Sequence, residues 1–335
     1  MQFPIHCKTL LSLLADGHFH SGTGLARSLG LSRSAVWGMI HDLQARGLAF
    51  SAVPGKGYRL AKPLELLDGD TILASLSETA RQRILGLEIH DELDSTNTFL
   101  MSQAASGRPS GTVCLAESQT AGRGRIGRAW QSPYGGAICL SLLWRFEEHG
   151  SVAGLSLAVG VAIHRALRRA GIKGIGLKWP NDLLCEDRKL GGILLEVVGE
   201  AHGRCAVVVG IGLNVQLPSG PAKAIDQAWT DLSQIIGGKP PSRNQLVAYL
   251  LEELLDLLAH YPTRGLSAYL DEWRQWHCMG GRKAVLHVGD KTIEGVVAGV
   301  SEAGLLLLDC GEAGLKEFAS GDVRLRADQG KRSAQ

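Results

Sequence analysis

The chain has 335 residues, of which 45% are hydrophobic and 20% charged, and its formal net charge is +2. This length predicts two or three domains, and the composition excludes a chain kept disordered by high charge and few apolar residues. No apolar run approaches the ~20 residues that span a bilayer, Leu10–Ala15 is too short for the core of a signal peptide, and the seven scattered cysteines form no C-x-x-C pair. We therefore expect a cytoplasmic protein without a membrane span, a zinc ribbon or a disulfide framework.

The charge is unevenly distributed along the chain. Residues 1–62 carry seven basic and two acidic side chains, a net charge of +5, which leaves −3 for the remainder. A small basic N-terminal part joined to a slightly acidic body predicts that this part alone contacts a polyanion.

The pattern of residues 1–65 predicts short helices followed by a hairpin. Gly17 and Gly30 end the first two helices, and Ser32 is a suitable N-cap for the third, whose apolar positions recur at helical spacing. Helix, tight turn, second helix and β-wing together predict a winged helix-turn-helix domain. The expected elements are a helix over Lys8–Ala15, a helix from Ser21 to Gly30, a recognition helix over Arg33–Arg46, and strands Leu48–Val53 and Tyr58–Leu60.

Residues 66–276 mix long apolar strands with helices, which predicts an α+β domain built on a mixed sheet. Runs such as Cys205–Gly210 are apolar on both faces and should lie deep in that sheet. The expected strands are Thr112–Glu117, Gly136–Arg145, Gly174–Trp179, Gly192–Val198 and Cys205–Val215, and the expected helices are Ser95–Ser106, Ser151–Ala170 and Arg243–His260.

Residues 277–327 change character again, because short strands alternate with glycine-containing turns. That density of strands and turns predicts a small β-barrel. A polar tail follows at residues 328–335. The expected strands are Lys283–Val288, Thr292–Val300, Leu305–Cys310, Leu315–Ala319 and Val323–Arg326.

The most informative segment is the glycine- and arginine-rich stretch Gln119–Trp130. It contains a formal G-x-G-x-x-G, and Glu147 follows the last of these glycines by 20 residues, as in a dinucleotide-binding fold. We reject that interpretation, because the loop of such a fold must open directly into a helix and the residues that follow are poor helix formers. There is also no G-K-[S/T], so this is not a P-loop. Arginine forks bind carboxylate or phosphate, so we predict an anion-binding loop rather than an ordinary surface loop, with Arg123, Arg125 and Arg128 as its cations.

Two further segments place glycines beside polar side chains at strand ends. In Lys178–Asp182, Pro180 must end the strand, and the Asn-Asp pair turns the chain toward Lys189 at the start of the returning strand. A lysine at a strand end is ordinarily a solvated charge, and the glycines beside it together with the anion-binding loop upstream shift the interpretation toward a ligand site only modestly. Gly210–Asn214 follows a buried strand, and taken alone it fits a bulge with a capping asparagine equally well.

Taken together, these motifs resemble the family of bifunctional biotin–protein ligases and biotin operon repressors over nearly the whole chain. The Gly-Arg loop combined with Lys-Trp-Pro-Asn-Asp is highly specific to these ligases, whereas lipoate and other acyl-protein ligases share the fold without this loop. The resemblance implies a class II synthetase-like ligase fold for the central domain and an SH3-like C-terminal barrel. It is carried by the N-terminal head, the C-terminal barrel and the segments Asp94–Asn97, Gln119–Trp130, Lys178–Asp182, Arg188–Ile193 and Gly210–Asn214.

The resemblance implies a reaction in two steps. The carboxylate of biotin attacks the α-phosphorus of ATP to give biotinyl-5′-adenylate and pyrophosphate. A lysine amine of the biotin carboxyl carrier protein of acetyl-CoA carboxylase then attacks the mixed anhydride. Fixed cations should help most, because charge spreads over the α-phosphate in the transition state.

The resemblance also implies a role for each residue of the site. Lys189 and Arg125 are the predicted catalytic residues, and Mg²⁺ accompanies ATP with Asp182 as an indirect ligand. The implied biotin-binding residues are Ser95, Thr96, Asn97, Gln119, Arg123, Gly124, Arg125 and Lys189, and the implied ATP- or adenylate-binding residues are Gly122, Arg128, Lys178, Asn181, Asn214 and Trp229.

The recognition helix departs from the expected pattern, because Trp37, Gly38 and Met39 stand where polar base-reading side chains are usual. Basic side chains still predict phosphate contacts, which dominate affinity for DNA. We expect phosphate contacts from Arg33, Arg46, Lys56 and Arg59, and an operator-binding surface made by Ser32, Arg33, Ser34, Trp37, His41, Lys56 and Arg59.

One recognition helix makes few contacts, so we predict a homodimer that reads an inverted repeat when the adenylate is bound. The resemblance places the dimer contact at an edge strand of the central sheet, for which Gly192–Val198 is the candidate. Two alternatives stay open: a ligand-responsive transcription factor without turnover, and a ligase whose head does not bind DNA. Arg125 and Lys189 argue against the first, and the charge of the head argues against the second.

Overall fold

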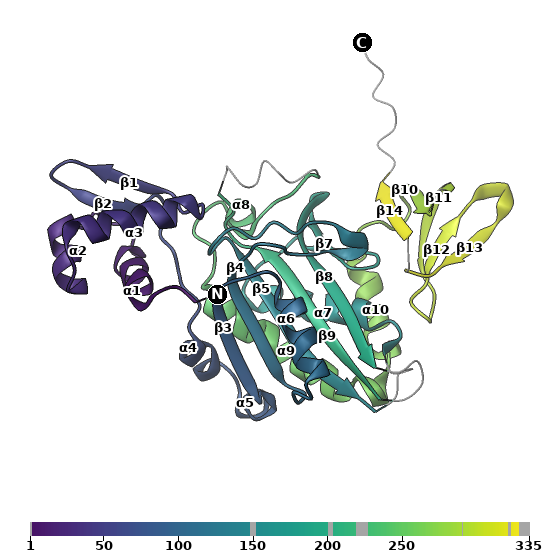
Figure 1. The fold of residues 1–335 in the computed structure, drawn as a ribbon. Helices are drawn as coiled ribbons and strands as arrows, with labels where there is room; N and C mark the ends of the chain where they lie inside the picture. Colours follow the sequence, from purple (N-terminus) through teal and green to yellow (C-terminus); the bar gives the residue numbers. More distant parts are fainter. Residues whose placement is uncertain are drawn as a thin grey trace, which may run out of the picture.

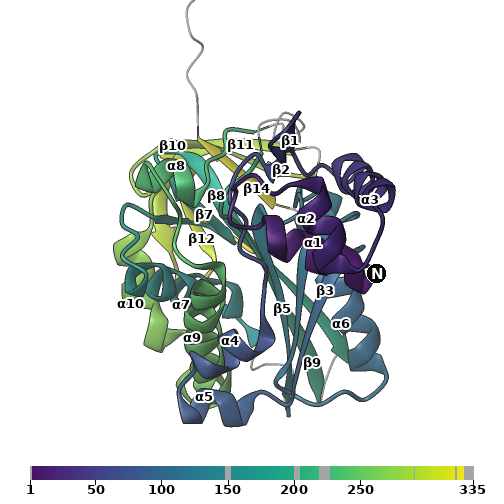
Figure 2. The same ribbon diagram turned by 90° about the vertical axis from the view of Figure 1, so that its left-hand side faces the viewer.

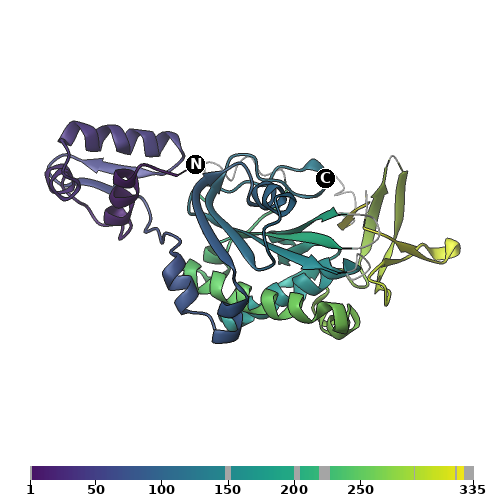
Figure 3. The same ribbon diagram turned by 60° about the horizontal axis from the view of Figure 1, so that its bottom comes forward.

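The computed structural model describes residues 2–147, 152–199, 204–218, 227–289, 291–320 and 323–327. A small N-terminal head and a C-terminal sheet lie at opposite ends of a central domain (Figure 1), and the view turned about the horizontal axis shows the same three parts in a row (Figure 3). The predicted polar tail at residues 328–335 lies outside the described residues. No described helix combines the length and the apolar character that a membrane crossing requires.

The head is a winged helix-turn-helix, as predicted. Ser21 and Ser32 each accept a hydrogen bond from a backbone N–H in the first turn of the helix that follows, and Gly30 ends the second helix at a φ of 66°. Val36, Ile40 and Leu43 are buried in the core of the head. The elements are α1 (Ile5–Leu14), α2 (Gly22–Leu29), α3 (Arg33–Ala45) and the wing strands β1 (Phe50–Val53) and β2 (Gly57–Leu60).

The central domain is a seven-stranded mixed sheet with the strand order β3-β4-β5-β9-β8-β7-β6. Helices α7 and α9 pack together on one face and α6 lies on the other (Figure 2). Its strands are β3 (Gly86–Leu93), β4 (Thr112–Gln119), β5 (Ala137–Phe146), β6 (Gly176–Lys178), β7 (Asp182–Cys185), β8 (Arg188–Gly199) and β9 (Cys205–Asn214). Its helices are α4 (Gly69–Ala74), α5 (Glu78–Arg83), α6 (Thr96–Ala105), α7 (Leu155–Arg169), α8 (Leu232–Ile236), α9 (Arg243–Arg264) and α10 (Ser267–Trp276).

Most predicted central elements are present within a few residues, and the apolar β9 lies between β5 and β8 as expected. The sequence reasoning missed strand β3, which carries several polar side chains and forms one edge of the sheet. It also missed β7, because this strand has only four residues and ends at the turn formed by Glu186 and Asp187, both of which have a positive φ.

The C-terminal part is a five-stranded antiparallel sheet with the order β13-β12-β11-β10-β14. All five predicted strands are present: β10 (Lys283–Val288), β11 (Lys291–Val300), β12 (Leu306–Asp309), β13 (Leu315–Phe318) and β14 (Val323–Ala327). The indole Nε1 of Trp179 donates to the backbone oxygen of Gly304 at 3.1 Å, which fastens this sheet to the central domain.

The head contacts β3 and the loop before β5. The carboxylate of Asp91 accepts from the backbone N–H of Phe3 at 2.6 Å and pairs with Lys8 at 3.1 Å, and the Phe3 ring stacks on Tyr134. The guanidinium of Arg46 pairs with Glu92 at 3.2 Å and lies over the Phe3 ring. Arg46 therefore faces the central domain in this structure, and its contact with phosphate stays a prediction.

A buried ion pair holds the linker between head and body. Arg243 at the start of α9 pairs with Glu117 of β4 at 2.7 Å, and the two side chains are 4% and 3% exposed. Arg243 also donates to the backbone oxygens of Glu65 and Ala137, and Glu117 accepts from the N–H of Leu67 at 2.6 Å. Buried charges are tolerated only when they are paired and hydrogen-bonded, so this pair fixes α9, β4 and the linker together.

We predict that Glu117→Gln lowers the free energy of unfolding by about 3–5 kcal/mol, because it leaves the Arg243 charge buried without its partner. Urea unfolding monitored by circular dichroism measures the change. Glu147→Gln is the matched control, since Glu147 pairs with Arg204 and the two side chains are 80% and 84% exposed; the loss there should stay below about 1 kcal/mol. Equal losses in the two variants would contradict the role given to the buried pair.

Candidate functional site

A cavity of about 1080 Å³ lies where the Gly-Arg loop, the β6-β7 hairpin and strands β8 and β9 meet. Every residue predicted for the biotin and ATP sites lines it except Gly122, and Asp182 lines it as well. Gly122 is buried and does not line the cavity, and a Cβ there would lie 2.6 Å from the backbone oxygen of Trp130. The chain thus brings together segments that are far apart in the sequence.

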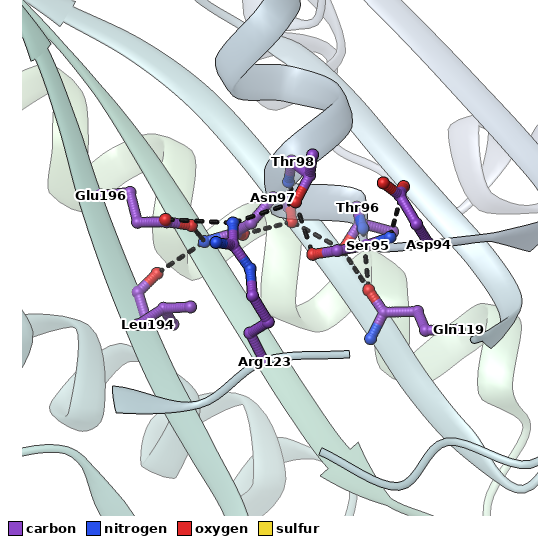
Figure 4. Close-up of polar contacts among 10 residues, drawn as sticks. Asp94, Ser95, Thr96, Asn97, Thr98, Gln119, Arg123, Leu194 and Glu196 are labelled. Atoms are coloured by element: carbon purple, nitrogen blue, oxygen red, sulfur yellow. Dashed lines mark hydrogen bonds and ion pairs between the residues drawn. The ribbon is translucent and has the colours of Figure 1, made fainter. Parts of the chain in front are cut away.

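One end of the cavity is a network of uncharged polar groups around the start of α6 (Figure 4). The side chain of Ser95 caps the helix, and the backbone N–H and hydroxyl of Thr96 donate to Gln119 Oε1 at 2.8 and 3.1 Å. Ser141 Oγ lies 2.8 Å from Thr96 Oγ1 and 2.6 Å from Asn97 Oδ1. Four of these groups are the predicted biotin-side residues, and Ser141 was missed because it lies inside an apolar strand.

The amide of Asn97 is fully engaged with protein groups. Its Nδ2 donates to the backbone oxygen of Leu194 at 3.2 Å and to Glu196 Oε2 at 2.8 Å (Figure 4), while its Oδ1 accepts from Ser141. A Cβ at Gly210 would lie 2.2 Å from the same oxygen, so the strand must carry glycine there. Asn97 therefore organises this end of the cavity.

The Gly-Arg loop folds back on itself as a narrow hairpin. Trp130 N–H donates to the Gly122 oxygen at 2.8 Å, and Gly124 N–H donates to the Arg128 oxygen at 2.7 Å. A single 3-10 turn, Arg125–Gly127, forms its tip. The chain continues in extended conformation and not as a helix, which supports the rejection of a dinucleotide-binding loop.

The three loop arginines all line the cavity but have different partners. Arg123 Nη2 donates to Thr98 Oγ1 at 2.9 Å and to Glu196 Oε1 at 3.2 Å. Arg125 donates to the backbone oxygen of Ser320, so the loop contacts the C-terminal sheet. Arg128 is exposed toward the mouth.

The other end of the cavity is cationic. Lys189 Nζ pairs with Asp182 at 2.6 Å and lies 5.9 Å from the centre of the Trp130 ring. Burial lowers the pKa of Lys178, and the nearby charges of Lys189 and Arg128 lower that pKa further, while Asp182 raises it. The Asp182 carboxylate thus pairs with Lys189, and its charge also acts on the ammonium group of Lys178.

Backbone oxygens hold the remaining predicted residues in place. Asn181 Nδ2 donates to the Ile193 oxygen at 2.7 Å, and Asn214 Nδ2 donates to the Thr230 oxygen at 3.0 Å. Trp229 forms a parallel bridge with Lys189.

Sequence reasoning missed one cation of the cavity. Arg282, at the start of the C-terminal sheet, lines the cavity and forms a two-pronged pair with Asp187. It belongs to no motif, so only the folded chain places it here. Among the described residues, the lining therefore contains six cations (Arg123, Arg125, Arg128, Lys178, Lys189 and Arg282) against two carboxylates (Asp182 and Asp187). Such an excess suits a site for more than one anion.

The predicted DNA-contacting side chains lie exposed on one helix and the wing of the head. Ser32, Arg33, Ser34, Trp37, His41, Lys56 and Arg59 are all exposed. The Trp37 indole is 53% exposed, and the His41 ring packs against it at 3.7 Å between centres. Arg59 lies over the Phe19 ring. An apolar indole on the reading face is unusual and leaves base recognition to few polar groups.

The chain is similar to known proteins in each of its parts. Residues 8–59 match an HTH domain family, residues 90–214 match the biotin/lipoate A/B protein ligase family, and residues 283–326 match the biotin protein ligase C-terminal domain. It is 39% identical to the bifunctional ligase/repressor BirA of Salmonella typhimurium over 95% of this chain and 97% of the relative. It is 32% identical to the protein of the same name from Bacillus subtilis, over 95% and 98%. A biotin protein ligase from Aquifex aeolicus, solved in complex with biotin and ATP, superposes with a TM-score of 0.63 at 30% identity, over 73% of this chain and 100% of that one.

We predict that Gly212→Ala loosens the Gly-Arg loop, because the new Cβ would lie 2.5 Å from Cε2 of the Trp130 ring that covers this glycine. Overpacking of this kind costs about 1–3 kcal/mol, which corresponds to at least about fivefold faster cleavage of the opened loop. Limited trypsin digestion followed by mass spectrometry at Arg123, Arg125 and Arg128 measures the rate. Gly280→Ala is the control, since its nearest neighbour would be 3.8 Å away. Equal cleavage rates in both variants would argue against packing by Trp130.

Proposed function

This chain belongs to the family of bifunctional biotin–protein ligases and repressors, and we propose that its cavity joins biotin and ATP as biotinyl-5′-adenylate. It is a biotin–protein ligase with a helix-turn-helix repressor head. The observation that supports the assignment of the cavity is its lining, an uncharged polar end beside a cluster of cations. The polar end fits the ureido and ring atoms of biotin, and the cations fit its carboxylate and the phosphates of ATP.

In the first step a biotin carboxylate oxygen bonds to the α-phosphorus, and the bond from this phosphorus to the β-phosphate oxygen breaks, releasing pyrophosphate. Two anions must approach each other, so the barrier falls when fixed cations neutralise the charge that develops. Lys189 is the candidate for this task, because Asp182 holds its ammonium group in a largely buried position before any ligand arrives. Arg125 and Arg128 can close on the phosphates from the loop.

In the second step the lysine amine of the carrier protein bonds to the acyl carbon of the mixed anhydride, AMP leaves, and the amine loses a proton. Water is a competing nucleophile throughout the lifetime of the adenylate. A loop that covers the anhydride lowers its access to water. The Gly-Arg loop is suited to this, since it is joined to the C-terminal sheet through Arg125 and to β8 through Arg123.

Magnesium accompanies ATP and would neutralise charge on its phosphates. The described residues contain no group of three or more His, Cys, Asp or Glu side chains that could hold a metal ion, and the Asp182 carboxylate already pairs with Lys189. Mg²⁺ usually keeps several waters and takes phosphate oxygens as ligands. Asp182 therefore fits an indirect contact through water.

We propose that the adenylate-bound chain forms a homodimer through β8 and binds operator DNA as that dimer. Strand β7 covers β8 only as far as Gly192. Beyond Ile193, no described strand pairs with the outer side of β8, and Val197 is 41% exposed there. An unpaired strand edge is a template for pairing with a second chain. The carrier protein of acetyl-CoA carboxylase is the proposed acceptor, and the cytoplasm is the proposed location.

The ligase assignment is tested by incubating the protein with biotin, Mg-ATP and a biotin carboxyl carrier domain and measuring the mass of the carrier. We predict that Lys189→Ala slows pyrophosphate release by about 10²–10³-fold, because it removes one charge-stabilising group. Lys173→Ala, at an exposed lysine outside the cavity, is the control. Pyrophosphate release at the parent rate in the Lys189 variant would remove this residue from the mechanism.

We predict that Val197→Glu abolishes adenylate-dependent dimerisation and weakens operator binding at least tenfold, because it places a charge on the unpaired edge of β8. Sedimentation and operator titrations with and without adenylate measure both effects, while adenylate formation should continue. Val296→Glu adds the same charge to the C-terminal sheet, where Val296 is 36% exposed, and serves as the control. Operator binding of the Val197 variant at parent affinity would exclude the β8 edge as the interface.

A further inference from the structure

Glu196 is the acidic side chain that joins the Gly-Arg loop to the polar end of the cavity (Figure 4). Its Oε1 accepts from Arg123 Nη2 at 3.2 Å, its Oε2 accepts from Asn97 Nδ2 at 2.8 Å, and it is 23% exposed. We propose that Glu196 is a positioning residue of the ligase, which fixes Arg123 beside the polar end of the cavity, where biotin is bound. The inference rests on the proposed function, because it requires that Arg123 contacts biotin.

The way in which Arg123 is held leaves part of its guanidinium for a ligand. Both contacts of this group, to Glu196 and to Thr98, are made by the one nitrogen Nη2. Nε and Nη1 make no hydrogen bond to a described residue, and Arg123 lines the cavity. A planar fork held at one nitrogen can still offer two parallel N–H groups to a carboxylate.

Glu196 itself is held on both sides. Asn97 is locked between Ser141, Leu194 and the backbone at Gly210, so the carboxylate oxygen that accepts from it has a fixed position. The other oxygen then sets the position of Arg123, whose own backbone belongs to a loop that lies outside the sheet. Without this anchor, the long arginine side chain would lose rotamer entropy only when the ligand binds, and the affinity for the ligand would be lower.

Removal of the Glu196 charge should change the affinity for biotin in opposite directions, depending on whether this residue acts by its charge or by positioning Arg123. A carboxylate close to a site for anions repels them, so neutralising it should tighten biotin binding if charge alone mattered. If Glu196 acts by holding Arg123, neutralising it should weaken biotin binding instead. The amide of a glutamine also cannot accept from both partners, because one of its two polar atoms is a donor.

The test is the kinetics of pyrophosphate release by Glu196→Gln, with biotin and ATP varied in turn. We expect the KM for biotin to rise about tenfold, because the loss of one charge-assisted hydrogen bond weakens binding by about this factor. The kcat and the KM for ATP should stay within about twofold. Glu88→Gln is the matched control, since Glu88 lies in β3, pairs with Arg108 at 3.5 Å and does not line the cavity. It should leave all constants unchanged.

A double-mutant cycle with Arg123→Ala shows whether Glu196 acts through this arginine. We expect the double variant to have the KM of Arg123→Ala alone, because the interaction is already lost. Additive effects, or a KM for biotin that is unchanged or lower in Glu196→Gln, would overturn the inference. If Glu196→Gln does not fold, Glu196→Asp provides the same test, with an expected KM between parent and Arg123→Ala and an unchanged KM overturning the proposal. A parent protein that releases no pyrophosphate from biotin and ATP would instead refute the proposed function.

Discussion

The buried pair between Glu117 and Arg243 is the contact on which the attachment of the linker to the central domain depends. Two buried charges are stable only while each is the partner of the other and the surrounding backbone satisfies most of the remaining groups. Backbone oxygens of the linker and β5 accept from Arg243 and a linker N–H donates to Glu117, while the buried Nε of Arg243 has no hydrogen-bond partner among the described residues. Glu117 and Gln119 both belong to β4, so the strand that is fixed by this pair also carries Gln119, which accepts from Thr96 in the cavity. The position of the head and the geometry of the site thus share one strand.

The cavity gathers more positive charge than its two carboxylates can balance, and the chain limits the resulting repulsion by giving most cations a partner. Lys189 has Asp182, Arg282 has Asp187, Arg123 has Glu196, and Arg125 has the oxygen of Ser320. The charge of Lys178 is less well compensated by nearby carboxylates. Burial and the neighbouring cations therefore lower its pKa. These partners hold the cations in place before a ligand arrives, so less reorganisation is needed during the reaction. Anions that bind must compete with them, and this favours ligands with several negative charges.

How far the sequence predicts this structure depends on whether the relevant signal is local. The head, the buried strands and the Gly-Arg loop follow from spacing, capping and glycine chemistry within short segments, and all are present, while anion binding by that loop stays a prediction. Strand β3 was missed because it is a polar edge strand, and Arg282 was missed because it reaches the cavity from another part of the chain. Arg46 shows that the sequence reveals a charge without revealing its partner. Its charge is visible in the sequence, but its pairing with Glu92 is not, because Glu92 lies in a different part of the fold.

Strand β8 connects the chemistry to the proposed interface. It carries Lys189 near its start, and the stretch that β7 leaves unpaired, from Ile193 to Gly199, carries Glu196. A ligand can shift a monomer–dimer equilibrium only by its difference in affinity for the two states, and the coupling is reciprocal. In the proposed dimer, pairing at the edge would restrict the backbone that positions Glu196, and through it Arg123. A ligand that stabilises Arg123 in this position should therefore also stabilise the dimer paired at β8. By reciprocity, dimerisation should strengthen adenylate binding by the same factor. A carrier protein that approaches the same edge would compete with the second copy, so the free edge of one strand can decide between acyl transfer and repression.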